Sequence, residues 1–268
     1  LPVQNVVSWN ALIAGYTHGE RGIDALNCYH QMKIQGISPS AITYACILKA
    51  CASVRSLCKG REAHVDSVLR GLDSNNFLGN SLIDMYIKCG SLLDAQAVFD
   101  ILPIRDVVSW TALVTGYGQL AEIEDIYPIL ERMMGEGITP DLVTFRAVLN
   151  ACSHSGLLDK AQTLFGNMTI KHGIFPHLEH LTCMVVIFGC AGYFDKAISV
   201  IKAEATCDYL AIWLALLGSC RKWGNVTLGK VAFDQILQRD LLPPRRMSLW
   251  PLHLHLQVCM RMLRTLIP

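Results

Sequence analysis

The chain contains a long internal repeat. The segment VVSWNALIAGY at residues 6–16 recurs as VVSWTALVTGY at residues 107–117, with eight of eleven residues identical at an offset of 101. The same offset maps ITYACILKAC onto VTFRAVLNAC, so a unit of about 101 residues is duplicated. A tandem repeat limits the fold to architectures in which each copy has the same local structure and buries its apolar face against the next copy.

The duplicated unit divides into shorter repeats, each of which opens with an amphipathic helix. Segments that begin at residues 6, 41, 76, 107, 142 and 178 carry apolar side chains at their fourth, seventh, eighth and eleventh positions, and only Gly79 departs from this pattern. In the first segment these residues are Trp9, Leu12, Ile13 and Tyr16. The i, i+3, i+4, i+7 spacing is the buried stripe of a helix with 3.6 residues per turn.

Each first helix is followed by a turn and a second apolar-periodic stretch, which predicts a helical hairpin. The predicted turns include residues 17–19, 89–91 and 154–156, and Gly-then-Pro loops at 36–39 and 137–140 should end second helices. Pro128 should kink or delay the second helix of the fourth hairpin, which the pattern places from Ile123. Because one hairpin cannot bury its own apolar face, we predict an all-α fold, a right-handed α-solenoid of six hairpins and a seventh.

The composition narrows the possible functions. With 268 residues and 52% apolar content, the chain can build a continuous core, yet no apolar stretch approaches the length of a membrane span. A formal charge of +1 means that any binding of nucleic acid must rest largely on base contacts. The eleven cysteines form no C-x-x-C pair and are interpreted as reduced, mostly buried apolar residues.

The lengths and motifs of the repeats resemble the plant pentatricopeptide repeat family. Units of 35, 35, 31, 35, 36 and about 31 residues alternate as in the mixed-length PLS class of that family, whereas tetratricopeptide arrays keep a more uniform period. Phrases such as SWNALIAGY, NSLIDMYIKCGSLLDAQAVFD and VTFRAVLNACSHSGLLDKA look like the motifs of this class. The resemblance covers roughly residues 1–240.

The resemblance also divides the chain into segments. Residues 1–5 match the end of an upstream repeat, so at least one further unit is expected before them. Residues 209–242 are similar to the E motif, which implies an RNA-editing factor. Residues 243–268 match neither the rest of the E region nor the DYW deaminase domain of many relatives, and we expect this divergent tail to be poorly ordered. The repeats between these ends are 6–40, 41–75 (long), 76–106 (short), 107–141, 142–177 (long) and 178–208 (degenerate short).

The resemblance implies a function in organellar RNA processing. The implied protein is a sequence-specific adaptor for single-stranded RNA, with recognition of C-to-U editing sites as its leading role and the catalytic activity supplied in trans. Its implied partners are single-stranded organellar RNA and, through the E-like region, a deaminase-bearing pentatricopeptide repeat protein or another editing factor, with no membrane and no cofactor. The expected location is the mitochondrion or the chloroplast. Because LPVQNVVSWN lacks presequence features, we expect the targeting segment to be absent from this chain.

Base reading is assigned to two positions in each unit. The fifth residue lies beside the apolar stripe, and by resemblance the last residue of the unit is the second reader. If the family's code applies, consecutive nucleotides should be C, any, U, G, any and weakly G. A polar residue on a solvated helix face also has a purely structural explanation, above all in the sixth unit. The pairs are Asn10 with Ser40, Asn80 with Asp106, Thr111 with Asp141, and Thr182 with Asp208.

The two long units offer no clear base code. They carry Ala45 with Asn75 and Arg146 with His177 at the reading positions. Arg146 is expected either to contact phosphate or to face solvent.

The second residue of each unit resembles the family's apolar wedges, which flank each base. On periodicity alone these residues fit the hairpin core equally well, and Glu179 breaks the pattern in the sixth unit. The wedge residues are Val7, Ile42, Phe77, Val108 and Val143.

No enzymatic or metal-binding motif is complete. His18-Gly19-Glu20 spells the H-x-E of zinc deaminases without a downstream P-C-x-x-C, and His253 and His255 lack further ligands at zinc spacing. We therefore expect no enzyme activity and no metal site. Two alternatives to RNA binding stay open, namely a tetratricopeptide-like scaffold that binds peptides and a truncated copy without function.

Overall fold

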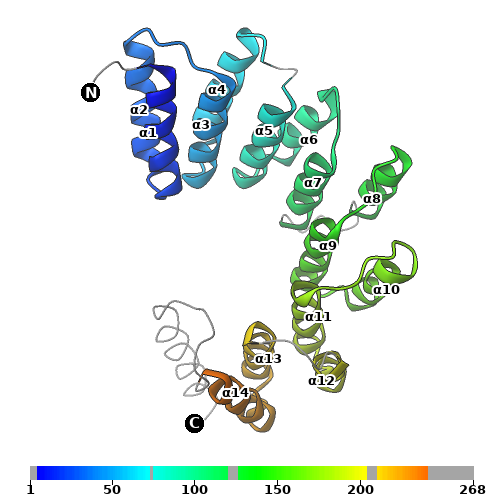
Figure 1. The fold of residues 1–268 in the computed structure, drawn as a ribbon. Coiled ribbons are helices and arrows are strands. Elements are labelled where there is room, and N and C mark those ends of the chain that lie inside the picture. Colours follow the sequence, from blue (N-terminus) through cyan, green and yellow to red (C-terminus); the bar gives the residue numbers. More distant parts are fainter. Residues whose placement is uncertain (1–4, 73–74, 120–125, 204–209, 241–268) are drawn as a thin grey trace. The chain divides into compact units, whose positions relative to one another are not determined.

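The computed structural model describes residues 5–72, 75–119, 126–203 and 210–240 (Figure 1). Within these ranges the regular structure is α-helical and contains no strand, which confirms the predicted all-α fold. The helices are α1 (Val6–His18), α2 (Gly22–Ile34), α3 (Ala41–Ser53), α4 (Leu57–Leu69), α5 (Asn76–Lys88), α6 (Leu92–Ile101), α7 (Val107–Gln119), α8 (Ile126–Gly135), α9 (Leu142–Ser155), α10 (Leu158–Ile170), α11 (Leu178–Cys190), α12 (Phe194–Ala203), α13 (Leu210–Trp223) and α14 (Val226–Asp240).

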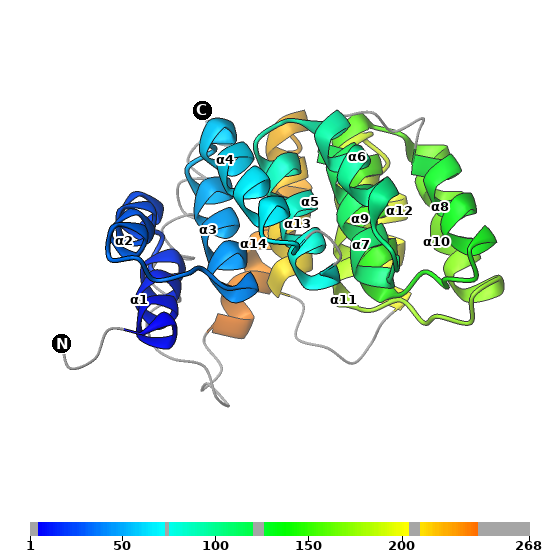
Figure 2. The same cartoon turned by 90° about the horizontal axis from the view of Figure 1, so that it is seen from above.

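The helices form two compact units, residues 1–139 and residues 140–268. In the first unit the first helices of the hairpins pack in a row, α1 against α3, α3 against α5 and α5 against α7, and each second helix packs against the first helix before it (Figures 1 and 2). In the second unit α9 packs against α11 and α11 against α13, with α10, α12 and α14 beside their partners. Each hairpin therefore covers the apolar stripe of its neighbour.

The buried stripes of the first helices meet between successive hairpins. Ile13 and Ile47 are 0% and 1% exposed, as the pattern predicts. Leu12, which holds the same position in α1 as Ile47 in α3, is nevertheless 40% exposed. The described helices that pack against α1 are α2 and α3. Leu12 is therefore more exposed in this structure than its place in the stripe predicts.

Gly79 does not leave a gap in the core. A Cβ atom at this position would collide with the side chain of Leu102, which follows α6 and is 6% exposed. Leu102 thus fills the space that an apolar side chain occupies at the fourth position of the other units. The missing stripe residue is replaced by one from the far end of the same hairpin.

Glycines end the second helices where the sequence predicts, but two predicted turns begin later. Gly36 and Gly137 have φ of +71° and +80°, in the left-handed region that favours glycine, just after α2 and α8. The helix α1 continues through residues 17–18 and α9 through residues 154–155. Shifts of one or two residues are the usual uncertainty of helix ends.

Pro128 lies in α8, which is described from Ile126 to Gly135. Residues 120–125 lie outside the described ranges, and they include Ile123, where this helix is predicted to begin, and residue 124, whose carbonyl would accept from an N–H at position 128. That Pro128 kinks or delays this helix therefore stays a prediction.

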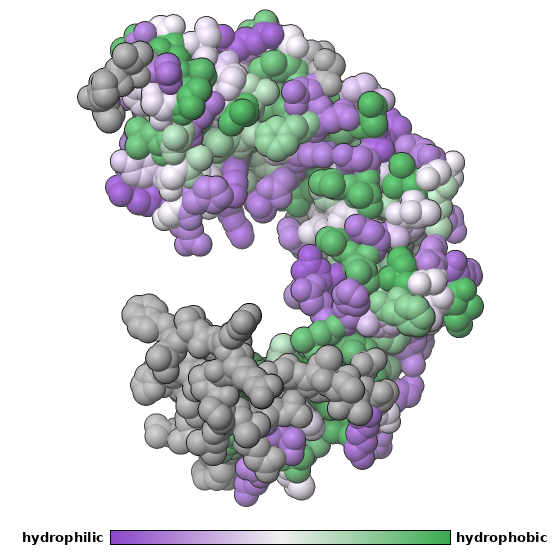
Figure 3. Space-filling model, in the orientation of Figure 1, coloured by the Kyte–Doolittle hydropathy of each residue, from purple (hydrophilic) through white to green (hydrophobic). Residues whose placement is uncertain are grey.

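The surface of both units mixes polar and apolar side chains, as the visible faces in Figure 3 show. Among the helices that the structure describes, none is both long and apolar enough to cross a bilayer. The divergent tail, residues 243–268, lies outside the described ranges.

The nine cysteines in the described ranges form no disulfide with one another. Four are buried, four are half-buried and Cys58 is exposed. Burial raises the pKa of the Cys51 thiol to about 12 and that of the Cys152 thiol to about 11. These two thiols are therefore neutral and unreactive at physiological pH.

Candidate nucleic-acid interface

The last residue of a unit is the N-cap of the next first helix. Ser40, Asp106 and Asp141, three of the predicted second readers, accept the N–H of the third helical residue at 3.3, 2.9 and 2.8 Å through their side-chain oxygens. Asn5 and Asn75 make the same contact at 3.0 Å each. This bond satisfies a free helical donor and fixes the direction of the capping side chain. Apolar periodicity alone does not reveal these caps, although the residue types that form them are visible in the sequence.

Asn10 and Ser40, predicted to read one base together, are in direct contact. The Asn10 Nδ2 donates to Ser40 Oγ at 3.2 Å, although the two residues are 30 positions apart in the chain. The Asn10 Oδ1 accepts the hydroxyl proton of Thr43 at 2.6 Å. Both readers are half-buried, so their polar atoms lie at the surface of the first-helix row and are held by neighbours. Thr43 is a site residue that the sequence analysis misses.

Asn80 lies at the same position of α5 in a different environment. Its side chain is half-buried, and its Oδ1 is buried without a hydrogen-bond partner among the described residues. The hydroxyl of Ser109 donates to the Asp106 carbonyl at 2.9 Å rather than to Asn80. The Asn80 amide is thus not held by neighbouring side chains through its oxygen, in contrast to the Asn10 amide.

The two threonines at the fifth position are half-buried. The Thr182 hydroxyl donates to the Leu178 carbonyl of its own helix at 2.8 Å, which favours the structural explanation of this residue. Its predicted partner, Asp208, lies outside the described ranges. Thr111 belongs to the first unit and Asp141 to the second, so each is placed within its own unit only.

The second residue of five units is an exposed apolar side chain. Between 45% and 69% of the surface of these residues is exposed, so the alternative that they belong to the hairpin core is excluded. They stand at the second position of α1, α3, α5, α7 and α9, whereas α11 has Glu179 there. A regular series of exposed apolar groups calls for an explanation by binding, since isolated exposed apolar residues are otherwise scattered. The residues are Val7 and Ile42, Phe77 and Val108 in the first unit, and Val143 in the second.

Arg146 forms an ion pair and does not project freely into solvent. Its Nη1 is 3.0 Å from Oε2 of Glu179, the residue that breaks the apolar pattern at the second position of the sixth repeat. At the start of α11, His180 takes the role that Ser or Thr usually has as the third residue of a first helix. Its Nδ1 accepts the backbone N–H of the N-cap residue His177 at 3.1 Å. The His180 Nε2 then lies 2.8 Å from the Leu142 carbonyl, which assigns the proton to Nε2.

No group of three His, Cys, Asp or Glu residues is arranged to hold a metal ion within the described ranges. His18 and Glu20 are both exposed at the end of the first hairpin turn. His253 and His255 lie outside these ranges.

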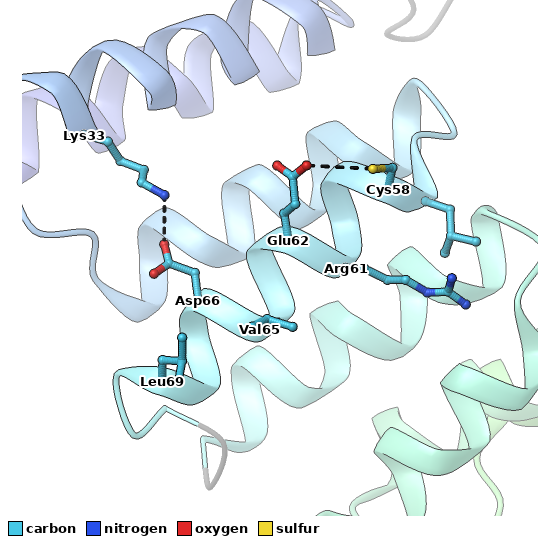
Figure 4. Close-up of a pocket in the computed structure, with 8 residues that line it drawn as sticks. Lys33, Cys58, Arg61, Glu62, Val65, Asp66 and Leu69 are labelled. Carbon is cyan, nitrogen blue, oxygen red and sulfur yellow. Dashed lines mark hydrogen bonds and ion pairs between the residues drawn. The ribbon is translucent and has the colours of Figure 1, made fainter.

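A groove lies on the second helices of the first unit, along α4 (Figure 4). It has a volume of about 850 Å³ and is lined by apolar residues such as Val65 and Leu69 between charged ones. Its charges are paired, since Lys33 lies 3.3 Å from Asp66 and Arg61 lies 2.6 Å from Asp94 of α6. The groove is thus separate from the row of first helices that carries the predicted readers.

Comparison with known proteins places these features in a family. Sequence profiles of the PPR repeat family match residues 4–53 and 105–154, and those of the PPR repeat match residues 80–106 and 143–171. The pentatricopeptide repeat-containing protein CRR2, chloroplastic, of Arabidopsis thaliana is 40% identical over 234 residues, which are 87% of this chain and 36% of the relative. A mitochondrial pentatricopeptide repeat-containing protein of the same plant is 37% identical over 234 residues, or 87% of this chain and 30% of the relative. The chain spans less than half the length of these relatives.

Solved structures agree with this grouping. The crystal structure of the pentatricopeptide repeat protein PPR10 in complex with an 18-nt psaJ RNA element matches with a TM-score of 0.60 and 16% identity, over 99% of this chain and 36% of that chain. PPR10 from maize matches with a TM-score of 0.55 and 18% identity, over 98% and 43%. The likeness confirms the predicted α-solenoid fold. On the profile matches and the relatives together, the chain belongs to the pentatricopeptide repeat family.

Proposed function

We propose that this chain binds single-stranded RNA along its first helices, with one nucleotide for each hairpin. The observation that carries the proposal is the series of exposed apolar residues at the second position of the units, beside polar side chains at the fifth position. Bases offer flat apolar faces that pack on such groups and polar edges that reach the neighbouring side chains. A protein of the same fold, PPR10, has been crystallised with an RNA element.

The proposed base preferences follow the pairs of polar readers. Asn10 with Ser40 should select C, Asn80 with Asp106 should select U, and Thr111 with Asp141 should select G. The contact of Asn10 with Ser40 supports the idea that a pair of readers acts on one base. Thr182 with Asp208 is expected to add only a weak preference for G, because the Thr182 hydroxyl is already bonded to its own helix.

Exchange of one reader tests the proposal. Asn80→Thr should move the third preference from U toward G, because an amide and a hydroxyl present different donors and acceptors to a base edge. We expect the ratio of the affinities for U-containing and G-containing RNAs to change by roughly tenfold, within the range of a specific base contact. The ratio is measured by fluorescence anisotropy with the whole 268-residue chain and short RNAs that differ at that nucleotide.

The control for this exchange is Asn27→Thr, the same substitution at an exposed position of α2. It should leave the ratio as it is. Circular dichroism of both variants separates a change of preference from damage to the repeat, which would weaken binding to every RNA alike. An unchanged ratio in a folded Asn80→Thr protein would remove Asn80 from the readers.

We further propose that the protein acts in a plant organelle, in the recognition of C-to-U editing sites, with a deaminase supplied by a separate protein. Relatives of the chain are described as mitochondrial and as chloroplastic. We propose that residues 209–242 form an E-like segment that contacts an editing factor, and the described part of this segment is the hairpin of α13 and α14. Sequencing of organellar transcripts that copurify with the full-length gene product tests this role. Transcripts that lack edited sites downstream of the predicted sequence would contradict it.

A further inference from the structure

Thr43 makes a hydrogen bond that the capping of its own helix does not require. It is the third residue of α3 and is completely buried. Its Oγ1 accepts the backbone N–H of Ser40 at 2.9 Å, which completes the capping box of α3. Its single hydroxyl proton is directed to Asn10 Oδ1 at 2.6 Å, across to the first helix of the preceding hairpin.

Three side chains form a closed ring of hydrogen bonds around the Asn10 amide. The Thr43 hydroxyl donates to Asn10 Oδ1, and Asn10 Nδ2 donates to Ser40 Oγ at 3.2 Å. The ring closes between Ser40 Oγ and Thr43 Oγ1, which are 3.1 Å apart. In such a ring each hydroxyl polarises the next, so the bonds strengthen one another. The amide retains one N–H and one oxygen lone pair for a ligand.

The lengths of the bonds in the ring favour one orientation of the amide. Rotation of the Asn10 carboxamide by 180° would reverse the direction of the ring and put an N–H···O bond at the 2.6 Å position of Thr43 and an O–H···O bond at the 3.2 Å position of Ser40. The short contact suits an O–H···O bond and the long one an N–H···O bond, so the close approach of Thr43 holds the oxygen of the amide on its own side. An amide that can rotate offers either a donor or an acceptor at a given point, and it selects a base less sharply. A fixed amide offers only one pattern.

The equivalent residue of α7 does not make this bond. The Ser109 hydroxyl donates to the Asp106 carbonyl at 2.9 Å. Asn80, the fifth residue of the hairpin before Ser109, has an Oδ1 without a partner among the described residues. The bond from Thr43 to Asn10 is therefore a property of this position and not of the cap as such.

We propose that Thr43 is a positioning residue for base selection, which holds the Asn10 amide in the one orientation that distinguishes C from U. This proposal rests on the proposed function, since it assumes that Asn10 reads a base. The two pyrimidines differ at this edge by an amino donor on C and a carbonyl acceptor on U. An amide that is free to rotate can satisfy both, whereas the orientation fixed by Thr43 satisfies only one.

The test compares variants of Thr43 in the whole chain. Thr43→Val removes the hydroxyl and keeps the shape, so the ratio of affinities for RNAs with C and U at the Asn10 nucleotide should fall by roughly fivefold, the equivalent of one hydrogen bond. Preferences at the other nucleotides should stay as they are. Thr43→Ser restores the hydroxyl and should restore the ratio. Thr43→Ala provides the same test if valine prevents folding.

Two controls separate positioning from stability and from the proposed function itself. Ser8→Ala removes the capping box of α1 without touching the Asn10 amide, so it should lower the melting temperature and leave the C-to-U ratio unchanged. Asn10→Thr should change the ratio if Asn10 reads a base. An unaltered ratio in folded Thr43→Val, together with an altered one in Asn10→Thr, would overturn the positioning role and leave base reading intact. Equal binding of C and U by the unmodified chain, or an unaltered ratio in folded Asn10→Thr, would instead refute base reading at this hairpin.

Discussion

Neutralisation of Glu179 should strengthen RNA binding and make it more sensitive to salt. Arg146 is the fifth residue of its unit and is 3.0 Å from Glu179, which occupies the position of an apolar wedge. Their side chains are 44% and 64% exposed, and an exposed ion pair contributes only about 0.2–1 kcal/mol. Glu179→Gln should therefore lower the melting temperature by no more than a few degrees, since about 1 kcal/mol corresponds to roughly 2–4 °C in a chain of this size.

The effect on RNA binding is larger than the effect on stability. In the unmodified chain the Glu179 carboxylate pairs with the Arg146 guanidinium and would repel the phosphates of a bound RNA. Glu179→Gln leaves Arg146 able to pair with one phosphate, and each phosphate contact to a single strand steepens the slope of log K against log salt by about 0.7. The gain in affinity should consequently shrink by roughly 2.6-fold between about 50 and 200 mM salt.

Fluorescence anisotropy with one RNA at several salt concentrations measures this slope. Asp94→Asn is the control, because Asp94 pairs with Arg61 at 2.6 Å with exposures of 35% and 55%, but on the second helices α6 and α4. The control should not change the slope. Equal slopes for Glu179→Gln and the unmodified chain would refute the reasoning that Arg146 is held away from RNA by Glu179.

Two further predictions concern stability. Gly79→Ala should lower the free energy of unfolding in urea by at most about 2 kcal/mol, because its Cβ displaces the end of the Leu102 side chain while alanine favours the helix by up to about 1 kcal/mol over glycine. The combined change with Leu102→Ala should cost less than the sum of the two single changes. Burial lowers the pKa of His64, whose Nδ1 lies 2.9 Å from the Tyr86 hydroxyl, so the unfolded chain binds the proton more readily. The stability from this residue is complete above about pH 6.5 and is lost as the pH falls below that value. The melting temperature of His64→Gln should therefore fall less between pH 7 and 5 than that of the unmodified chain. The control His30→Gln, at an exposed position, should not have this effect.

The helices could be predicted from the sequence because the signals that define them are local. A stripe with a period of 3.6 residues and the glycines at 36 and 137 are properties of short segments, and the structure follows them to within one or two residues. Contacts between residues that are far apart in the sequence could not be predicted from such local signals. Nothing near Gly79 in the sequence indicates that Leu102, 23 residues later, fills its space.

The polar positions of the candidate site could be predicted, but their chemical state could not. Polarity beside an apolar stripe is enough to select Asn10 and Asn80. The structure then distinguishes the two, since one amide is held by two hydroxyl-bearing residues and the other has an unpaired oxygen. The ion pair of Arg146 with Glu179 joins residues 33 positions apart. Each of these differences depends on contacts between neighbouring hairpins, which no single repeat encodes.

Helix capping limits the residues that can serve as second readers. The last residue of a unit must begin the next first helix, and only a few side chains, chiefly Asn, Asp, Ser and Thr, cap a helix well. If this residue also reads a base, the choice of reader is confined to that set, and a change of specificity at this position need not weaken the fold. His177 is the exception, because it makes no side-chain cap and relies on His180 to accept its N–H. The unit that ends at His177 is also the unit whose first reader, Arg146, is held in an ion pair. The side-chain cap and a clear pair of base readers are therefore missing from the same unit. The residues that do cap are Asn5, Ser40, Asn75, Asp106 and Asp141.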